Sequence, residues 1–182
     1  MVRKYMVPFL FAALLILPAQ SMAQCSMKGW VQLFDGYSLD GWKKSEENPE
    51  SFKLENGRIV AKGPRAHLFY VGDVMDHNFQ NFELKVDVMT KKNSNGGIFI
   101  HTEYQEKGWP SKGYEVQVNN TYNKDPRKTG SLYNVDDVMD QYAKDDVWFT
   151  EHIVVLGDHV TIYIEDKQDG KSTKVVDYIE PK

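Results

Sequence analysis

Short stretches in which apolar and polar residues alternate recur along the chain, and turn residues separate them. In one stretch, Phe82, Leu84, Val86 and Val88 alternate with mainly polar neighbours. This period of two predicts a strand with one buried face and one face in water. The stretch 51–61 carries Asn-Gly at its centre. Both of those residues tolerate a positive φ, so the stretch predicts a hairpin with a tight turn.

Strands and turns are predicted through the rest of the chain as well. No stretch beyond residue 23 has a convincing helical period, although 136–144 is compatible with one or two helical turns. Many short strands separated by turns are typical of an all-β fold, a two-sheet antiparallel sandwich or jelly roll. The additional strands are predicted at residues 97–103, 113–119, 152–156 and 160–164, the last two around a Gly157-Asp158 turn, and around Val175-Val176 after an Asp169-Gly170 turn.

The first 23 residues have the features of a secretory signal peptide. Arg3 and Lys4 precede an apolar run over 6–17, and Ser21-Met22-Ala23 supplies a small-x-small cleavage site. The run is shorter than the ~20 apolar residues that a membrane span needs, which disfavours the alternative of a membrane anchor. We therefore expect one domain over 24–182, secreted or periplasmic, with no membrane span.

The charge and the cysteine content narrow the choice of partners. Of 22 basic and 26 acidic residues, the predicted signal peptide holds 2 basic ones, so 20 and 26 remain, a net charge of −6 over 159 residues. An acidic chain without a basic block argues against a nucleic-acid partner, and a neutral substrate fits it better. The single cysteine, Cys25, leaves no intramolecular disulfide, and Gln24 before it disfavours a lipid anchor. No pattern in the sequence indicates an oligomeric state.

Two of the predicted strands carry the most suggestive polar residues. In one strand Glu115, Gln117 and Asn119 share a face, and in the other His101 and Glu103 do so. If the two strands pair with these faces aligned, the polar side chains form a cluster suited to sugar hydroxyls. The alternative is an ordinary solvated sheet face without a ligand.

The sequence gives weaker evidence, or none, for other kinds of binding or catalytic site. Trp109 lies in a loop, where its ring either forms a platform for a sugar or folds back over the core edge. The acidic run 136–146 lacks the regular spacing of a calcium loop, so a solvated segment is favoured. The five histidines show no metal-binding spacing, and the sequence has no phosphate loop and no serine elbow.

Six segments, in order along the chain, resemble the motifs of the 3-keto-disaccharide hydrolase domain family. Together they span nearly the whole chain beyond the predicted signal peptide. The segments are Trp30–Trp42, Phe52–Val60, Asn81–Leu84, Asn93–His101, Gly113–Gln117 and Gly130–Tyr133. The resemblance implies a fold like that of concanavalin-like lectins and laminarinase-type glucanases, with a concave ligand face. It also implies a carbohydrate substrate, a glycoside oxidised at C3.

The sequence departs from the family pattern at two places. Asn95 is an additional residue in its segment, and His101 stands where arginine is common. The chain also stops at Pro181-Lys182 where family members usually continue, so we expect a C-terminally shortened domain. A sandwich that lacks its last strands would leave an unpaired edge, which favours aggregation.

The resemblance and the polar face together suggest a chemistry for the site. A keto group at C3 acidifies the proton on C2, so cleavage needs a base and a group that stabilises the enolate oxygen. We expect Glu115 to be the base and His101 to be the proton shuttle or enolate stabiliser. The expected substrate-binding residues are Gln117, Glu103, Asn119, Trp109 and Tyr133. The sequence specifies no cofactor, and a divalent metal ion is compatible with this chemistry.

Three other functions stay open on the sequence alone. A retaining glycosidase needs two carboxyl groups about 5–5.5 Å apart, which Glu103 and Glu115 would have to supply across two strands. A carbohydrate-binding module would have the same fold and polar face without an acid or base. A purely structural domain would not respond to sugars.

Overall fold

The computed structural model describes residues 29–182, and the predicted signal peptide lies outside them. Residues Leu33–Lys182 form one compact unit, which is built almost entirely from antiparallel strands. Within the described residues, helix is limited to the two short 3₁₀ segments η1 (Pro49–Ser51) and η2 (Val74–His77). The strands are β1 (Trp42–Lys44), β2 (Phe52–Glu55), β3 (Arg58–Ala61), β4 (Leu68–Tyr70), β5 (Phe82–Val88), β6 (Gly96–Ile100), β7 (Tyr114–Val118), β8 (Phe149–Leu156), β9 (His159–Asp166) and β10 (Ser172–Ile179).

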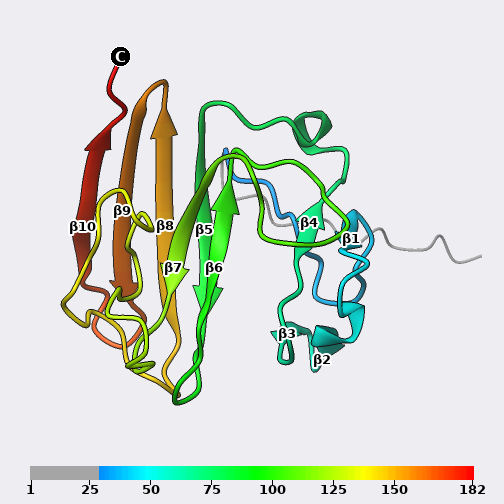
Figure 1. Ribbon diagram of the computed structural model, residues 1–182, viewed down its shortest axis with the longest axis horizontal. Coiled ribbons are helices and arrows are strands. Elements are labelled where there is room, and N and C mark those ends of the chain that lie inside the picture. Colours follow the sequence, from blue (N-terminus) through cyan, green and yellow to red (C-terminus); the bar gives the residue numbers. More distant parts are fainter. Residues whose placement is uncertain (1–28) are drawn as a thin grey trace, which may run out of the picture. The chain divides into compact units, whose positions relative to one another are not determined.

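The largest sheet contains four strands in the order β10-β9-β8-β5, seen side by side in Figure 1. Its strands alternate between a buried and a wetter face, as the period-two pattern of β5 predicts. Ile153 of β8 and Ile162 of β9 are directly paired and completely buried. Burying an apolar side chain of this size stabilises the fold by roughly 1.5–3 kcal/mol.

The β6–β7 hairpin packs over this sheet through the main hydrophobic core. Ile100 of β6 and Val116 of β7 belong to the same buried cluster as Ile153 and Ile162. An isolated bridge from Val116 to Leu132 adds the following loop to the outer edge of the hairpin. The result is a two-layer, antiparallel, all-β sandwich, which confirms the predicted fold class.

Two small two-stranded sheets complete the unit, β1 with β4 and β2 with β3. In the β2–β3 hairpin, Asn56 has φ 50° and Gly57 has φ 73°. Positive values at both central positions are those of a type I′ turn, so the Asn-Gly prediction is confirmed. Within residues 29–182 no helix is long and apolar enough to cross a membrane.

Two local predictions are wrong. Residues 136–144 form no helix, because their polar groups bond to the neighbouring loop instead: Val138 N donates to Ser131 Oγ at 2.9 Å, and Lys128 N donates to Val138 O at 2.8 Å. The strand expected over 97–103 ends at Ile100, because His101 has φ 54° and leaves the extended conformation.

Candidate functional site

The candidate site lies on the face of the β6–β7 hairpin that points away from the core. Glu115 of β7 is paired with Phe99 of β6, and Gln117 with Gly97. These four residues alternate with Ile98 and Val116, which pack into the core, so they share the opposite face. The polar face predicted for residues 113–119 is therefore present at Glu115 and Gln117.

Tyr133 borders Glu115 on the side away from Phe99. The bridge between Val116 and Leu132 puts Glu115 and Tyr133 opposite each other, and Tyr133 N donates to Glu115 O at 2.9 Å. Glu115 is thus flanked by two aromatic residues in one row across the sheet, Phe99 on one side and Tyr133 on the other. Tyr133 is one of the residues expected at the site from the sequence, and the structure brings it there.

The Glu115 side chain lies directly over Gly97. A Cβ atom at residue 97 would come within 2.5 Å of Glu115 Cγ and 2.8 Å of its Cδ, so only glycine leaves room for the carboxyl in this position. Burial, assisted by the charge of Asp125, raises the pKa of Glu115 to about 7. A carboxyl with this pKa exchanges its proton near neutral pH, as a general base must.

Replacing Gly97 tests whether this close approach holds the carboxyl in place. In Gly97→Ala we expect the fold to persist and the Glu115 side chain to move outward into water, so that its pKa falls from about 7 toward 4.5. The pKa can be followed by a carbon-13 NMR titration of the Glu115 carboxyl. Gly96→Ala is the matched control, because a Cβ at residue 96 meets nothing within 4 Å. An unchanged titration of Glu115 in Gly97→Ala would contradict this account.

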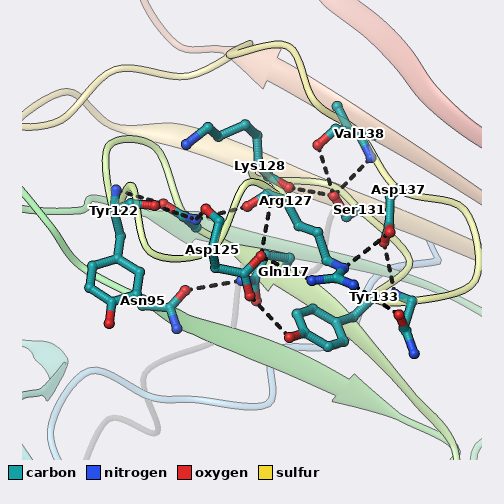
Figure 2. Close-up of polar contacts among 12 residues, drawn as sticks. Asn95, Gln117, Tyr122, Asp125, Arg127, Lys128, Ser131, Tyr133, Asp137 and Val138 are labelled. Carbon is teal, nitrogen blue, oxygen red and sulfur yellow. Dashed lines mark hydrogen bonds and ion pairs between the residues drawn. The ribbon is translucent and has the colours of Figure 1, made fainter.

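Gln117 is almost completely buried beside Glu115. One end of its amide lies 3.0 Å from Asn95 Oδ1, and the other faces Gly96 O at 2.8 Å and Glu115 Oε1 at 3.3 Å. Because both atoms near this second end are acceptors, we assign the amide nitrogen to it. In that orientation Gln117 donates to Glu115 Oε1, and its amide oxygen accepts from the Asn95 amide, whose nitrogen then takes the Oδ1 position. Asn95, the additional residue in its segment, contacts the other end of the same amide (Figure 2).

A charged cluster begins beyond Tyr133 (Figure 2). The Tyr133 hydroxyl donates to Asp125 Oδ2 at 3.0 Å, and the Arg127 guanidinium covers the Tyr133 ring at 4.5 Å. Arg127 also pairs with Asp125 at 3.2 Å and with Asp137 at 3.0 Å. Burial would raise the pKa of Asp125, but the Arg127 backbone N–H, the Tyr133 hydroxyl and the Arg127 charge outweigh it and lower the pKa. Asp125 therefore stays negative near Glu115.

Asp125→Asn tests the electrostatic part of the Glu115 pKa. The asparagine retains the size of the side chain and an acceptor for Tyr133 but removes the charge. We expect the pKa of Glu115 to fall by about 0.5–1 unit, because a neighbouring like charge disfavours ionisation. Asp137→Asn is the control, since Asp137 binds the same Arg127 without contributing to the shift at Glu115. Equal Glu115 titrations in the two variants would assign the whole shift to burial.

Asn119 organises the loop after β7. It is completely buried, and its side-chain nitrogen lies within hydrogen-bonding distance of three carbonyl oxygens, those of Tyr122, Asp125 and Arg127, at 2.8–3.2 Å. Its side-chain oxygen accepts from Tyr122 N at 2.8 Å. These bonds fix the loop that carries Asp125 and leave the amide no exposed group with which to orient a sugar, contrary to the sequence-based expectation.

His101 and Glu103 do not join the cluster expected around Glu115. The left-handed backbone at His101 turns its ring toward the other layer, where it contacts Phe82 at 5.8 Å and Gln80 O at 3.1 Å. Glu103 lies in the exposed loop beyond and pairs with Lys112 at 2.7 Å. The expectation of one shared face assumed that the strand continues to residue 103, whereas it ends at Ile100.

A histidine that the sequence analysis did not single out for this face lies next to it instead. The His67 ring contacts Phe99 at 5.4 Å and Trp109 at 5.6 Å, both edge to face. Trp109 remains 60% exposed, with the Arg65 guanidinium 5.3 Å from its ring centre. Ring contacts thus lead from Trp109 through His67 to Phe99, the residue paired with Glu115. In the sequence His67 precedes the apolar run Leu68-Phe69-Tyr70, and no motif marks it as part of this face.

No group of three or more acidic, histidine or cysteine side chains within residues 29–182 is arranged to hold a metal ion. The face combines one carboxyl with a raised pKa, a buried amide, three aromatic rings and an imidazole. These residues are Glu115, Gln117, Phe99, Tyr133, Trp109 and His67.

Comparisons with known proteins decide the family. Residues 29–180 match the 3-keto-alpha-glucoside-1,2-lyase-like domain family. The chain belongs to this family. The match covers most of the chain and confirms the resemblance inferred from the six motifs.

Two relatives place this family member among known proteins. The 3-keto-disaccharide hydrolase of Bacteroides thetaiotaomicron is 31% identical over 77 residues, which cover 39% of this chain and 27% of that protein. The match thus spans about a quarter of the length of the curated relative. A solved structure from Parabacteroides distasonis, a candidate glycosyl hydrolase, is 22% identical with a TM-score of 0.67, over 85% of this chain and 74% of that one. At this level of identity the likeness shows a shared fold.

Proposed function

We propose that this protein cleaves glycosides whose sugar carries a keto group at C3, with Glu115 as the base that removes the proton from C2. The observation that carries the proposal is the half-buried Glu115 carboxyl, held between two aromatic residues with a pKa of about 7. At neutral pH a large share of such a carboxyl is ionised and ready to accept a proton, yet it is more basic than an ordinary glutamate.

The proposed reaction is an elimination. Glu115 takes the C2 proton, the C–H electron pair forms a C2=C3 double bond, and the carbonyl electrons move to O3 as an enolate. When C3=O forms again, the electron pair shifts to C1=C2 and the C1–O bond to the aglycone breaks. The aglycone oxygen receives the proton from Glu115, which restores the carboxylate. Addition of water to C1=C2 then gives net hydrolysis.

The family and the composition support this substrate class. The family is described as 3-keto-alpha-glucoside-1,2-lyase-like, and the relative from B. thetaiotaomicron is a 3-keto-disaccharide hydrolase. An acidic protein with aromatic rings beside its site suits a neutral sugar, which presents an apolar ring face and many hydroxyls. The signal peptide predicted for residues 1–23 would place the reaction outside the cytoplasm.

The rival mechanism of a retaining glycosidase has less support. It needs a second carboxyl about 5–5.5 Å from Glu115. Glu103, the candidate from the sequence, is bound to Lys112 in an exposed loop. Asp125 is tied to Arg127 and Tyr133 and has a lowered pKa, so it is a poor proton donor for a leaving group.

The test is incubation of the purified protein with 3-keto-trehalose and with unoxidised trehalose, following the release of free sugar. We expect release from the keto-sugar alone, because only the C3 carbonyl acidifies the C2 proton. Equal release from both sugars would favour the glycosidase. Binding of either sugar by the folded protein without any release would identify a carbohydrate-binding module instead.

A further inference from the structure

The backbone and the aromatic neighbours of His67 hold it rigidly. Ser45 N donates to His67 O at 2.8 Å, and His67 N donates to Ser45 Oγ at 3.0 Å. Ser45 therefore binds both polar groups of the His67 backbone. Ser45 is itself 1% exposed. The imidazole is surrounded by the rings of Phe69, Phe99 and Trp109 at 5.4–6.0 Å. Such a side chain has little rotamer freedom left to lose when a ligand binds.

Within the described residues, no group forms a hydrogen bond with the nitrogen atoms of the His67 ring. His67 is 8% exposed, yet the hydrogen bonds of the described residues reach only its backbone. Neither ring nitrogen is among the fully sealed, unpaired polar atoms of residues 29–182, so both can be reached from outside. A rigid imidazole at the border of a site, whose nitrogens are open to the outside and have no protein partner, is available to bind a ligand.

His67 and Glu115 are both neighbours of the same residue, Phe99. Phe99 contacts the His67 ring and is directly paired with Glu115. Paired residues of antiparallel strands have Cα atoms about 4.5–5.5 Å apart. A sugar ring resting on Phe99 would therefore lie next to both the carboxyl and the imidazole.

We propose that His67 is a further substrate-binding residue, which donates a hydrogen bond to the C3 carbonyl oxygen of a 3-keto-sugar lying over Phe99 beside Glu115. The proposal rests on the proposed function and assigns the polar partner that the enolate oxygen requires. Burial, assisted by the charge of Arg65, lowers the pKa of His67, so the ring is a neutral donor at neutral pH. It holds the negative oxygen by its N–H and transfers no proton.

The expected kinetic result is a large loss in His67→Phe and a partial recovery in His67→Gln. Phenylalanine retains the aromatic packing but removes the donor, so kcat/KM for 3-keto-trehalose should fall about 100-fold or more, chiefly in kcat. Glutamine places a donor near the position of Nε2 and should regain about tenfold. His159→Phe, on a partly exposed histidine of β9 that pairs with Asp177, is the control and should keep wild-type kinetics. Wild-type values in His67→Phe would overturn the proposal.

A second measurement does not depend on turnover. The ring nitrogen-15 resonances of His67 are followed by NMR in the Glu115→Gln variant while 3-keto-trehalose is added. We expect the His67 signals to shift and to keep the neutral form, while those of His159 stay in place. Unmoved His67 signals at saturating sugar would overturn the assignment, even if His67→Phe failed to fold. Absence of product with the wild type would instead refute the proposed reaction, and the His67 shift would still report on binding.

Discussion

Glu115→Gln is expected to lower kcat for a 3-keto-glycoside by about 10²–10⁴-fold, the usual contribution of a positioned general base. Glutamine has nearly the shape of glutamic acid, so the contact over Gly97 and the pairing with Phe99 should persist. The amide cannot accept a proton from C2, and the loss should therefore appear in kcat more than in KM. Binding of 3-keto-trehalose by the variant should remain measurable by calorimetry.

The pH profile gives the same prediction a second check. Because the pKa of Glu115 is raised to about 7, the carboxyl is protonated and inactive in acid, and wild-type kcat/KM should rise with pH through about 7. Glu103→Gln is the control for a nearby carboxyl on the exposed loop and should keep full activity. If activity on unoxidised glycosides were lost in both variants, the paired-carboxyl mechanism would replace the one proposed here. Full turnover of the keto-sugar by Glu115→Gln would exclude Glu115 as the base.

The sequence predicts the sandwich well because the fold depends on local signals. The alternation in β5, the Asn56-Gly57 turn and the tight turn before His159 each act within about ten residues of chain, and each is present in the structure. The same alternation correctly puts Glu115 and Gln117 on one face. These are residues whose direction follows from their position in a regular strand.

The rest of the site depends on backbone irregularities and on distant segments. The left-handed conformation of His101 reverses the direction of its side chain, and no residue type in that stretch requires it. His67 reaches the face through Phe99, which is 32 residues away in sequence, and Asp125 reaches it through Tyr133. Such contacts are made only when the sheets and loops pack together, so periodicity cannot predict them.

Glu151 is the residue for which we expect the largest effect on stability. It lies in β8 between Val86 of β5 and Ile164 of β9, completely buried, and neither carboxyl oxygen has a hydrogen-bond partner. The nearby N–H of Gly130 offsets part of the effect of burial on the Glu151 pKa, but its hydrogen bond goes to Gln117 O at 2.9 Å. Burial therefore raises the pKa of Glu151 well above that of an ordinary glutamate and favours its neutral form in the folded protein.

The sign of the pH dependence follows from this raised pKa. Below the unfolded value of about 4.5 both states bind the proton, and Glu151 leaves the unfolding free energy unaffected by pH. Between that value and the folded pKa only the unfolded state releases the proton, so stability falls as pH rises, by about 1.4 kcal/mol per pH unit. Glu115, whose pKa is also raised, acts in the same direction below about pH 7.

Replacing Glu151 by methionine should remove the loss of stability at high pH that Glu151 causes, and it fills the same volume with an apolar group. We expect the unfolding free energy of Glu151→Met at pH 8 to exceed that of the wild type by roughly 1–3 kcal/mol, with a smaller gain near pH 4. Urea unfolding from pH 4 to 8 measures both. Glu55→Gln, at an exposed position of β2, should stay within about 0.5 kcal/mol of the wild type. A destabilised Glu151→Met with an unchanged pH slope would mean that the carboxyl has a stabilising partner in the folded protein.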